Sequence, residues 1–147
     1  RADATAETIT QDGYLHTGDV GYQDDGGFIY LVDRIKDLIL CSGYNVYPRV
    51  IEEAIYQHEA VDETIVIAVP DAYRGQSPKA FIKLKEGHSL TADDMKAFLK
   101  DHLSTIELPR DYEFRDELPK TMVGKLSKKE LVEEEAQKRA AAEARSA

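Results

Sequence analysis

The sequence contains a single cysteine, Cys41, no tryptophan and no long apolar run. One cysteine excludes an internal disulfide and any metal site built from several cysteine ligands. No segment approaches the roughly 20 apolar residues that cross a bilayer. The first residues also lack the basic, apolar and small-residue order of a secretory signal peptide. These absences favour a cytoplasmic protein without a transmembrane segment.

The first residue is Arg1 rather than methionine, and the chain has 147 residues. This length suits one domain with a core, or a small domain joined to part of another. We therefore expect a processed or truncated piece of a longer protein.

Acidic residues are in excess, and the formal net charge is -9. Such a charge argues against nucleic-acid binding over the whole surface. The charge reverses locally in residues 119–129, which contain four lysines and no acid: Lys120, Lys125, Lys128 and Lys129. This segment is either an anion site or a solvated basic loop, and charge alone does not decide between them.

The hydrophobic pattern predicts a mixture of strands and helices. Apolar runs indicate strands at 28–32, 38–41, 64–69, 80–84 and 112–114. Helical spacing indicates helices at 49–58, from Thr91 onward and from Ser127 onward, with loops at 74–78 and 117–126. Pro48 stands where a proline of the first helical turn would stand. With at least one antiparallel strand pair, the fold class is α+β. The charged segment 33–37 is predicted to be a break between two strands, and it is the best candidate for a domain boundary.

Three segments carry residues suited to chemistry, and the first is Tyr14-Leu15-His16-Thr17-Gly18-Asp19. The Asp19 carboxylate only accepts hydrogen bonds, and its two oxygens match the two hydroxyls of a ribose. The simpler interpretation is a turn aspartate bonded to its own backbone. His16 and Asp19 do not form a metal site, because no further ligand is spaced to join them.

The second segment runs from Val32 through Asp37 and continues as Ser42-Gly43-Tyr44-Asn45-Val46-Tyr47-Pro48. Arg34, at the end of a strand, has donors that suit sugar or phosphate oxygens. Gly43 permits a positive φ angle or the close approach of a ligand to the backbone. A salt-bridged linker followed by a plain hairpin would explain the same residues.

The third segment is Leu118-Pro119-Lys120-Thr121-Met122-Val123-Gly124-Lys125-Leu126-Ser127. Lys125 follows a glycine in a loop, and such a mobile charge suits a phosphate or carboxylate during group transfer. The spacing is not that of a Walker phosphate-binding loop.

In this order and separation, the three segments resemble the C-terminal signatures of the adenylate-forming (AMP-binding) superfamily, over about residues 12–131. Within it, residues 37–48 look most like bacterial long-chain fatty acid–CoA ligases. The resemblance implies a small C-terminal lid domain, a β-hairpin plus a mostly antiparallel sheet flanked by helices. It implies the end of a large N-terminal adenylation domain at 1–33, a hinge at 34–37, the lid at 38–131 and a partly frayed helical tail at 132–147.

The resemblance also implies roles for individual residues. Asp19 and Arg34 would bind the ribose or phosphates of ATP and AMP, and Lys36 would be the hinge. Lys125 would act on the acid carboxylate and the α-phosphate during adenylation. The CoA tunnel would be lined by Ser42, Gly43 and Tyr44.

The implied reaction activates a fatty acid with ATP and Mg²⁺, then transfers the acyl group to CoA after the lid turns about Lys36. ATP and Mg²⁺ would be bound mainly by the missing N-terminal domain, so the fragment alone is predicted to be inactive. Some CoA ligases have an arginine where this chain has Asn45, so the nucleotide end of CoA would be held elsewhere. A lysine hinge such as Lys36 occurs in the superfamily.

Two other interpretations stay open. An adenylate-forming enzyme could deliver its acyl group to a carrier protein, and a non-catalytic interaction domain could keep the same fold. The length of the acid is not readable, because its pocket would lie in the missing domain. Peripheral contact with a membrane also stays open, although the mixed charge of the tail gives it little support.

Overall fold

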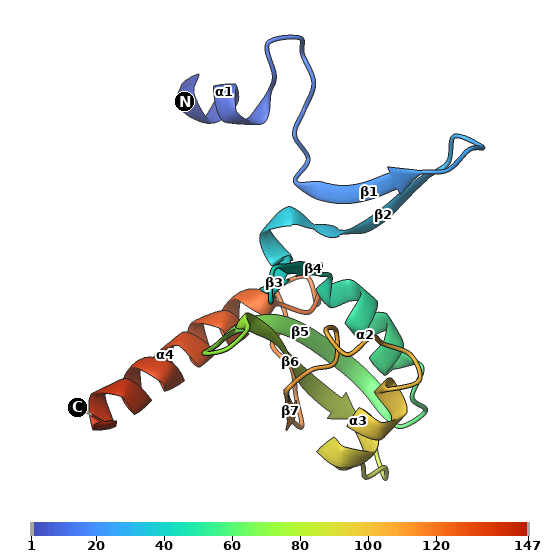
Figure 1. Cartoon of the computed structure of the whole chain (residues 1–147), viewed down its shortest axis with the longest axis vertical. Coiled ribbons are helices and arrows are strands. Elements are labelled where there is room, and N and C mark those ends of the chain that lie inside the picture. Colours follow the sequence, from blue (N-terminus) through green and yellow to red (C-terminus); the bar gives the residue numbers. More distant parts are fainter. Residues whose placement is uncertain (1, 147) are drawn as a thin grey trace. The chain divides into compact units, whose positions relative to one another are not determined.

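The computed structural model describes residues 2–146, which fall into two units that divide between Lys36 and Asp37 (Figure 1). The division lies inside the segment 34–37 for which a hinge is predicted. The hinge itself stays a prediction, and each unit is described by itself.

The first unit is built around an antiparallel hairpin. Helix α1 (Ala2–Thr8) precedes strand β1 (Asp19–Gln23), which pairs with β2 (Ile29–Arg34). The carboxylate of Asp24 accepts a hydrogen bond from the backbone N–H of Phe28 at 2.9 Å, and this bond contributes most to lowering the pKa of Asp24.

Strand β2 continues through Arg34, so the predicted charged break at 33–37 is wrong for its first two residues. Only Ile35–Asp37 leave the strand, as a short 3-10 helix, η1.

The second unit contains a five-stranded mixed sheet. Its order is β4-β3-β6-β5, and β7 adds to β6 in parallel. The strands are β3 (Ile39–Cys41), β4 (Tyr44–Val46), β5 (Val61–Asp71), β6 (Gly75–Leu84) and β7 (Asp111–Phe114). All other strand pairs are antiparallel. The predicted α+β class, with a hairpin and a mostly antiparallel sheet, is confirmed.

Helices cover both faces of this sheet (Figure 1). Val66, Ala80 and Ile82 belong to a core formed with α2 (Pro48–Tyr56) and α3 (Ala92–Leu99). Ile65, Ile67 and Phe81 point to the other face, into a second core that includes Leu131 of α4 (Lys128–Ser146). Successive side chains of a strand point to opposite faces, so two adjacent strands supply both cores.

The loop predicted at 74–78 is wrong, because β6 begins at Gly75 and includes Pro78. Proline lacks the N–H that a strand donates to its neighbour. Strand β3 pairs with β6 only at Gly75, and β7 pairs with it from Lys79 onward. Pro78 is the register partner of Ala68 in β5, but its carbonyl oxygen accepts from the N–H of Arg110 on the opposite side of β6, at 3.1 Å. The missing N–H of Pro78 would face that same side, between the pairings with β3 and β7, so no ladder hydrogen bond is lost.

Local signals determine the starts of two helices. Pro48 is the first residue of α2, as predicted. Thr91 caps α3 through a reciprocal pair of hydrogen bonds with Asp94. The buried Met95 and Leu99 then face the first core.

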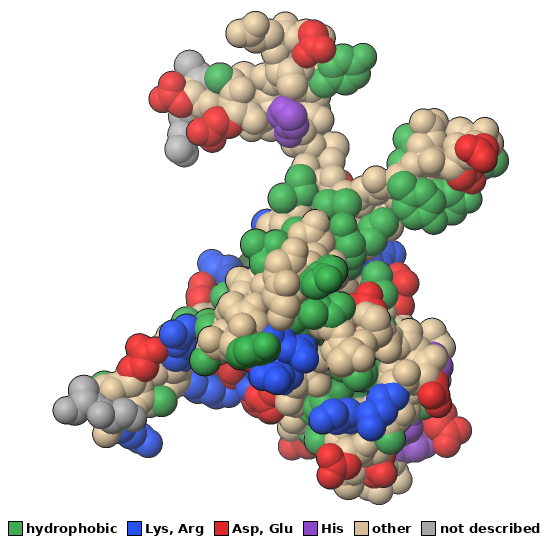
Figure 2. Space-filling view, in the orientation of Figure 1, with side chains coloured by type: hydrophobic (Ala, Val, Ile, Leu, Met, Phe, Trp, Pro, Cys, Tyr) green, Lys and Arg blue, Asp and Glu red, His purple; other side chains and the backbone are tan. Residues whose placement is uncertain are grey.

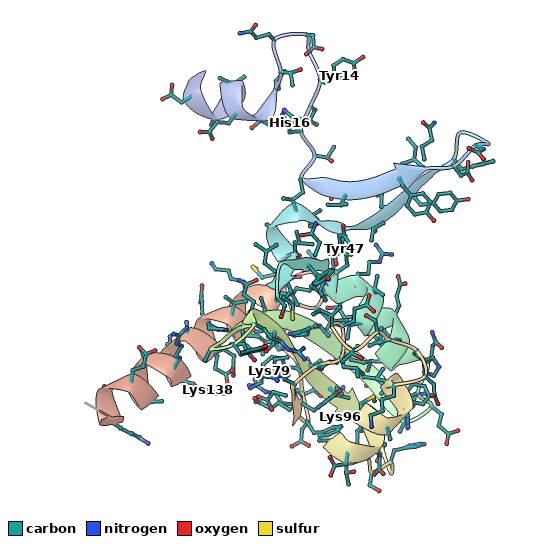
Figure 3. The ribbon with its side chains drawn as sticks, in the orientation of Figure 1. Tyr14, His16, Tyr47, Lys79, Lys96 and Lys138 are labelled. Carbon is teal, nitrogen blue, oxygen red and sulfur yellow. The ribbon has the colours of Figure 1, made fainter. Side chains whose placement is uncertain are left out.

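Charged side chains attach α4 to the sheet. The Nζ atom of Lys79 lies 3.0 Å from Glu135 of α4, and the side chain of Lys79 is only 7% exposed. Arg115 pairs with Glu134, and Lys138 Nζ lies 3.3 Å from Glu113 Oε2 of β7 (Lys79 and Lys138 are labelled in Figure 3). Helix α4 continues to Ser146, and the partial fraying expected for the helical tail at 132–147 stays a prediction. None of the helices in residues 2–146 meets the length and hydropathy required to span a bilayer.

Candidate functional site

Asp19 and Arg34, predicted from separate motifs, face each other across the end of the β1–β2 hairpin. They are partners in the strand register, and Arg34 Nε lies 3.4 Å from Asp19 Oδ1. Asp19 is 28% exposed and Arg34 61%. An open hollow of about 370 Å³ adjoins them, lined by Thr17, Gly18, Arg34, Ile35 and Lys36. The Asp19 carboxylate accepts hydrogen bonds and the Arg34 guanidinium donates several. Together they can bind a ligand that carries adjacent hydroxyl and phosphate groups.

Lys36 is exposed and is the last residue of the first unit. It lies in η1, between the end of β2 and the start of β3.

Within residues 2–146, no group of three or more His, Cys, Asp or Glu side chains could hold a metal ion.

Ser42 and Gly43 form the two-residue turn of the β3–β4 hairpin. Cys41 pairs with Tyr44 across the turn, and the φ angles of Ser42 and Gly43 are 51° and 82°. Positive φ at both positions is the requirement of a type I′ turn, which matches the twist of the flanking strands. Ser42, Gly43 and Tyr44 are all exposed. The structure thus brings the three predicted tunnel residues together at one accessible turn.

The sequence analysis missed Arg74, which lies against this turn. The N–H of Ser42 donates to the carbonyl oxygen of Arg74 at 2.8 Å, and Arg74 Nη1 lies 3.9 Å from the sulfur of Cys41. Arg74 is half-buried, and no carboxylate pairs with it among the described residues. Its position next to Ser42 depends on the pairing of β3 with β6, which no local pattern reveals.

Lys125 follows a compact turn in the loop before α4. Thr121 holds this turn, since its N–H donates to the carbonyl oxygen of Lys125 at 2.7 Å and its hydroxyl accepts from the N–H of Lys125 at 3.2 Å. Lys120 and Leu126 form an isolated β-bridge below it. The Lys125 side chain is exposed, and no ion-pair partner for it occurs within residues 2–146. Such an ammonium group is available to an anion from outside.

Comparison with known proteins gives consistent results. The family model of the AMP-binding enzyme C-terminal domain matches residues 50–125, just over half of the chain. A long-chain-fatty-acid–CoA ligase of Bacillus subtilis is 50% identical over 127 residues, which are 86% of this chain and 23% of that protein. A 2-succinylbenzoate–CoA ligase of Geobacillus is 44% identical over 131 residues, 89% of this chain and 26% of that protein.

The solved structures include ATP-bound MatB from Rhodopseudomonas palustris, which superposes with a TM-score of 0.83 at 32% identity. The match covers 88% of this chain and 26% of MatB. The chain thus spans about a quarter of the length of the relatives it matches. On the family match and on the fold, the chain belongs to the family of AMP-binding enzyme C-terminal domains.

Proposed function

We propose that this chain is the C-terminal part of an ATP-dependent ligase that joins a carboxylic acid to CoA, with a long-chain fatty acid as the substrate. The observation that carries the proposal is Lys125, an exposed ammonium group on a braced turn with no partner in the described chain. The 50% identity to a long-chain-fatty-acid–CoA ligase supports the choice of acid.

In the first half-reaction, the substrate carboxylate attacks the α-phosphorus of ATP and pyrophosphate leaves. The Lys125 ammonium neutralises negative charge on the transferring group, where such charge is costly. Asp19 accepts hydrogen bonds from the ribose hydroxyls, and Arg34 donates to the ribose or a phosphate. No residue cluster in the described chain fits Mg²⁺, so we assign it no ligand here.

In the second half-reaction, the CoA thiol attacks the acyl carbonyl and AMP leaves. The turn at Ser42, Gly43 and Tyr44 lines the route of the thiol-bearing arm. Lys36 is the hinge about which the small domain turns between the two steps. This rotation removes Lys125 from the reaction site and brings the turn at Ser42, Gly43 and Tyr44 to it. Two separate exposed turns on one domain suit two successive reactions.

The first hairpin supports the proposal that this chain works within a longer protein. A two-stranded hairpin alone is marginally stable. The β1–β2 hairpin nevertheless exposes apolar side chains: Tyr22, Phe28, Ile29, Tyr30 and Leu31. Green side chains gather over this hairpin in Figure 2. Burial against the rest of an adenylation domain would remove this surface from water.

The experiment that tests the function uses the complete protein that carries this chain. The protein is incubated with ATP, magnesium, CoA and carboxylic acids from acetate to oleate, together with an aromatic acid, and products are identified by mass spectrometry. Acyl-CoA formed preferentially from long-chain acids is the expected result. Acyl-CoA from the aromatic acid alone would overturn the choice of substrate, and acyl-adenylate without acyl-CoA would replace CoA with another acceptor such as a carrier protein.

A further inference from the structure

Two lysines flank the turn that carries Lys125, and each forms an ion pair with a carboxylate from a distant part of the chain. Lys120 Nζ lies 2.6 Å from Glu63 Oε1 of β5, and Lys128 Nζ lies 3.0 Å from Glu52 Oε1 of α2. One pair precedes Lys125 and the other follows it. Both pairs therefore attach the ends of the Lys125 loop to the core of the second unit.

These pairs are better shielded from water than an ordinary surface ion pair. The four side chains are between 17% and 37% exposed. By contrast, Lys129 and Glu133 on α4 are 83% and 60% exposed and lie 3.8 Å apart. Partly buried pairs are screened less by salt and solvent than exposed ones. The two flanking pairs can therefore fix the position of the Lys125 loop, whereas the exposed Lys129–Glu133 pair fixes nothing comparable.

The two carboxylates are held by different contacts. Glu52 Oε1 also accepts a hydrogen bond from the backbone N–H of Val66 at 2.9 Å, which lies on the outer edge of β5. Glu63 Oε2 is buried and has no hydrogen-bond partner within residues 2–146, so Lys120 is the cation that balances this carboxylate. Glu52 is therefore held by the backbone of β5 as well as by Lys128, whereas Glu63 is held by its ion pair with Lys120.

Helix stability does not explain the position of Lys128. This residue begins α4, where the helix dipole disfavours a positive side chain. The pairing with Glu52 offsets that cost. A lysine at this position therefore serves the contact with α2 rather than the helix.

Apolar packing complements the two pairs but does not replace them. Leu118 and Leu131 are buried, and Leu126 packs against the same second core. Hydrophobic contact is not directional. It therefore holds the loop against the second core but does not set the orientation of the loop. Charge-assisted hydrogen bonds are short and directional, and they can set the orientation.

We propose that Glu52 and Glu63 are positioning residues, which orient the Lys125 turn for adenylation through Lys128 and Lys120. This inference rests on the proposed role of Lys125. Lys125 has a long flexible side chain, so its reach is defined only if its backbone is held. A shift of about 1 Å at a catalytic group can slow a reaction by up to about 10²-fold.

The test uses Glu52→Gln and Glu63→Gln in the complete protein, since glutamine keeps the shape and an acceptor oxygen but removes the charge. The matched control is Glu133→Gln, which removes the carboxylate of the exposed pair on α4. Single-turnover adenylation is measured separately from thioester formation with supplied acyl-adenylate and CoA. We expect each variant to slow adenylation about 10-fold, with KM for ATP and acid and the thioester step within about 2-fold of the control.

A charge exchange, Glu63→Lys with Lys120→Glu, is expected to recover most of the lost adenylation rate, which a purely local fault at Glu63 would not allow. Adenylation rates equal to that of Glu133→Gln would overturn the inference. So would equal losses in both half-reactions together with a lowered melting temperature, because these indicate a general loss of fold. If Glu63→Gln does not fold, Glu52→Gln and the charge exchange decide the matter. If Lys125→Ala leaves adenylation intact, the proposed function fails rather than the positioning alone.

Discussion

At the scale of single residues, Lys125 makes the sharpest prediction. If Lys125 has the proposed role, Lys125→Ala in the complete protein should slow adenylation by about 10²-fold or more, because it removes the charge that stabilises the adenylyl group during its transfer. Under the proposed role, Lys125 acts in adenylation alone, so thioester formation from supplied acyl-adenylate should change little. Pyrophosphate release and acyl-CoA formation, measured separately, check both statements.

The control for Lys125 is Lys129→Ala, because Lys129 is an exposed lysine of the same basic segment, on the first turn of α4. It should leave both rates unchanged. Equal losses in both half-reactions for Lys125→Ala would contradict the role given to Lys125.

Gly43 tests the second half-reaction. Its φ angle is 82°, and a Cβ atom added there would meet nothing within 4 Å. A side chain at this position is therefore strained by the backbone, at about 1–2 kcal/mol, but is not blocked by the chain itself. If CoA passes this turn, Gly43→Leu should slow thioester formation about 10-fold or more and leave adenylation near normal.

Gly87 provides a matched control for that experiment. It has a φ angle of 76° and equally open surroundings, on a turn remote from the predicted motifs. Gly87→Leu should carry the same backbone strain without the kinetic effect. Thioester rates that fall equally in both variants would show that strain, rather than obstruction of CoA, is responsible.

At the scale of elements, ion pairs attach α4, and acid should weaken them. Hydrogen bonds from Arg115, and then from Lys138, lower the pKa of Glu134 to about 2. A carboxyl group with a lower pKa in the folded state than in the unfolded state stabilises the fold when it is charged. This stabilisation is complete above the ordinary pKa of 4.5 and is lost as the pH falls toward about 2.

We therefore expect the free energy of unfolding of the chain to fall with pH below about 4.5, and to fall less steeply in Glu134→Gln. Urea titrations followed by circular dichroism at several pH values measure this. Glu143→Gln is the control, because Glu143 pairs with Arg139 on α4 and both side chains are more than half exposed. An unchanged slope in Glu134→Gln would mean that other carboxylates dominate acid unfolding.

At the scale of the whole molecule, the chain covers about a quarter of its relatives, and its first hairpin exposes apolar side chains. We expect the isolated chain to show no ligase turnover and to bind ATP with a Kd weaker than about 1 mM, since Asp19 and Arg34 alone cannot supply the roughly 4 kcal/mol that this affinity requires. Isothermal calorimetry and the acyl-CoA assay measure both. Millimolar or tighter binding together with turnover would refute this expectation.

Patterns within a few residues determined much of this protein from the sequence alone. Apolar runs and helical spacing predicted the α+β class and the main strands and helices, and Pro48 and Thr91 marked two helix starts correctly. The order and spacing of three motifs pointed to the family, which the comparisons show. Local signals suffice for these features because turns, caps and periodicity depend on neighbouring residues.

Only the tertiary structure decided which distant residues meet. It paired Asp19 with Arg34, set Arg74 beside Ser42, and brought Glu52 and Glu63 to the two ends of the Lys125 loop. It also placed Pro78 inside a strand, where the local pattern predicted a loop. These outcomes follow from the order of strands in the sheet, because the strand order sets which side chains become neighbours and which backbone donors need a partner.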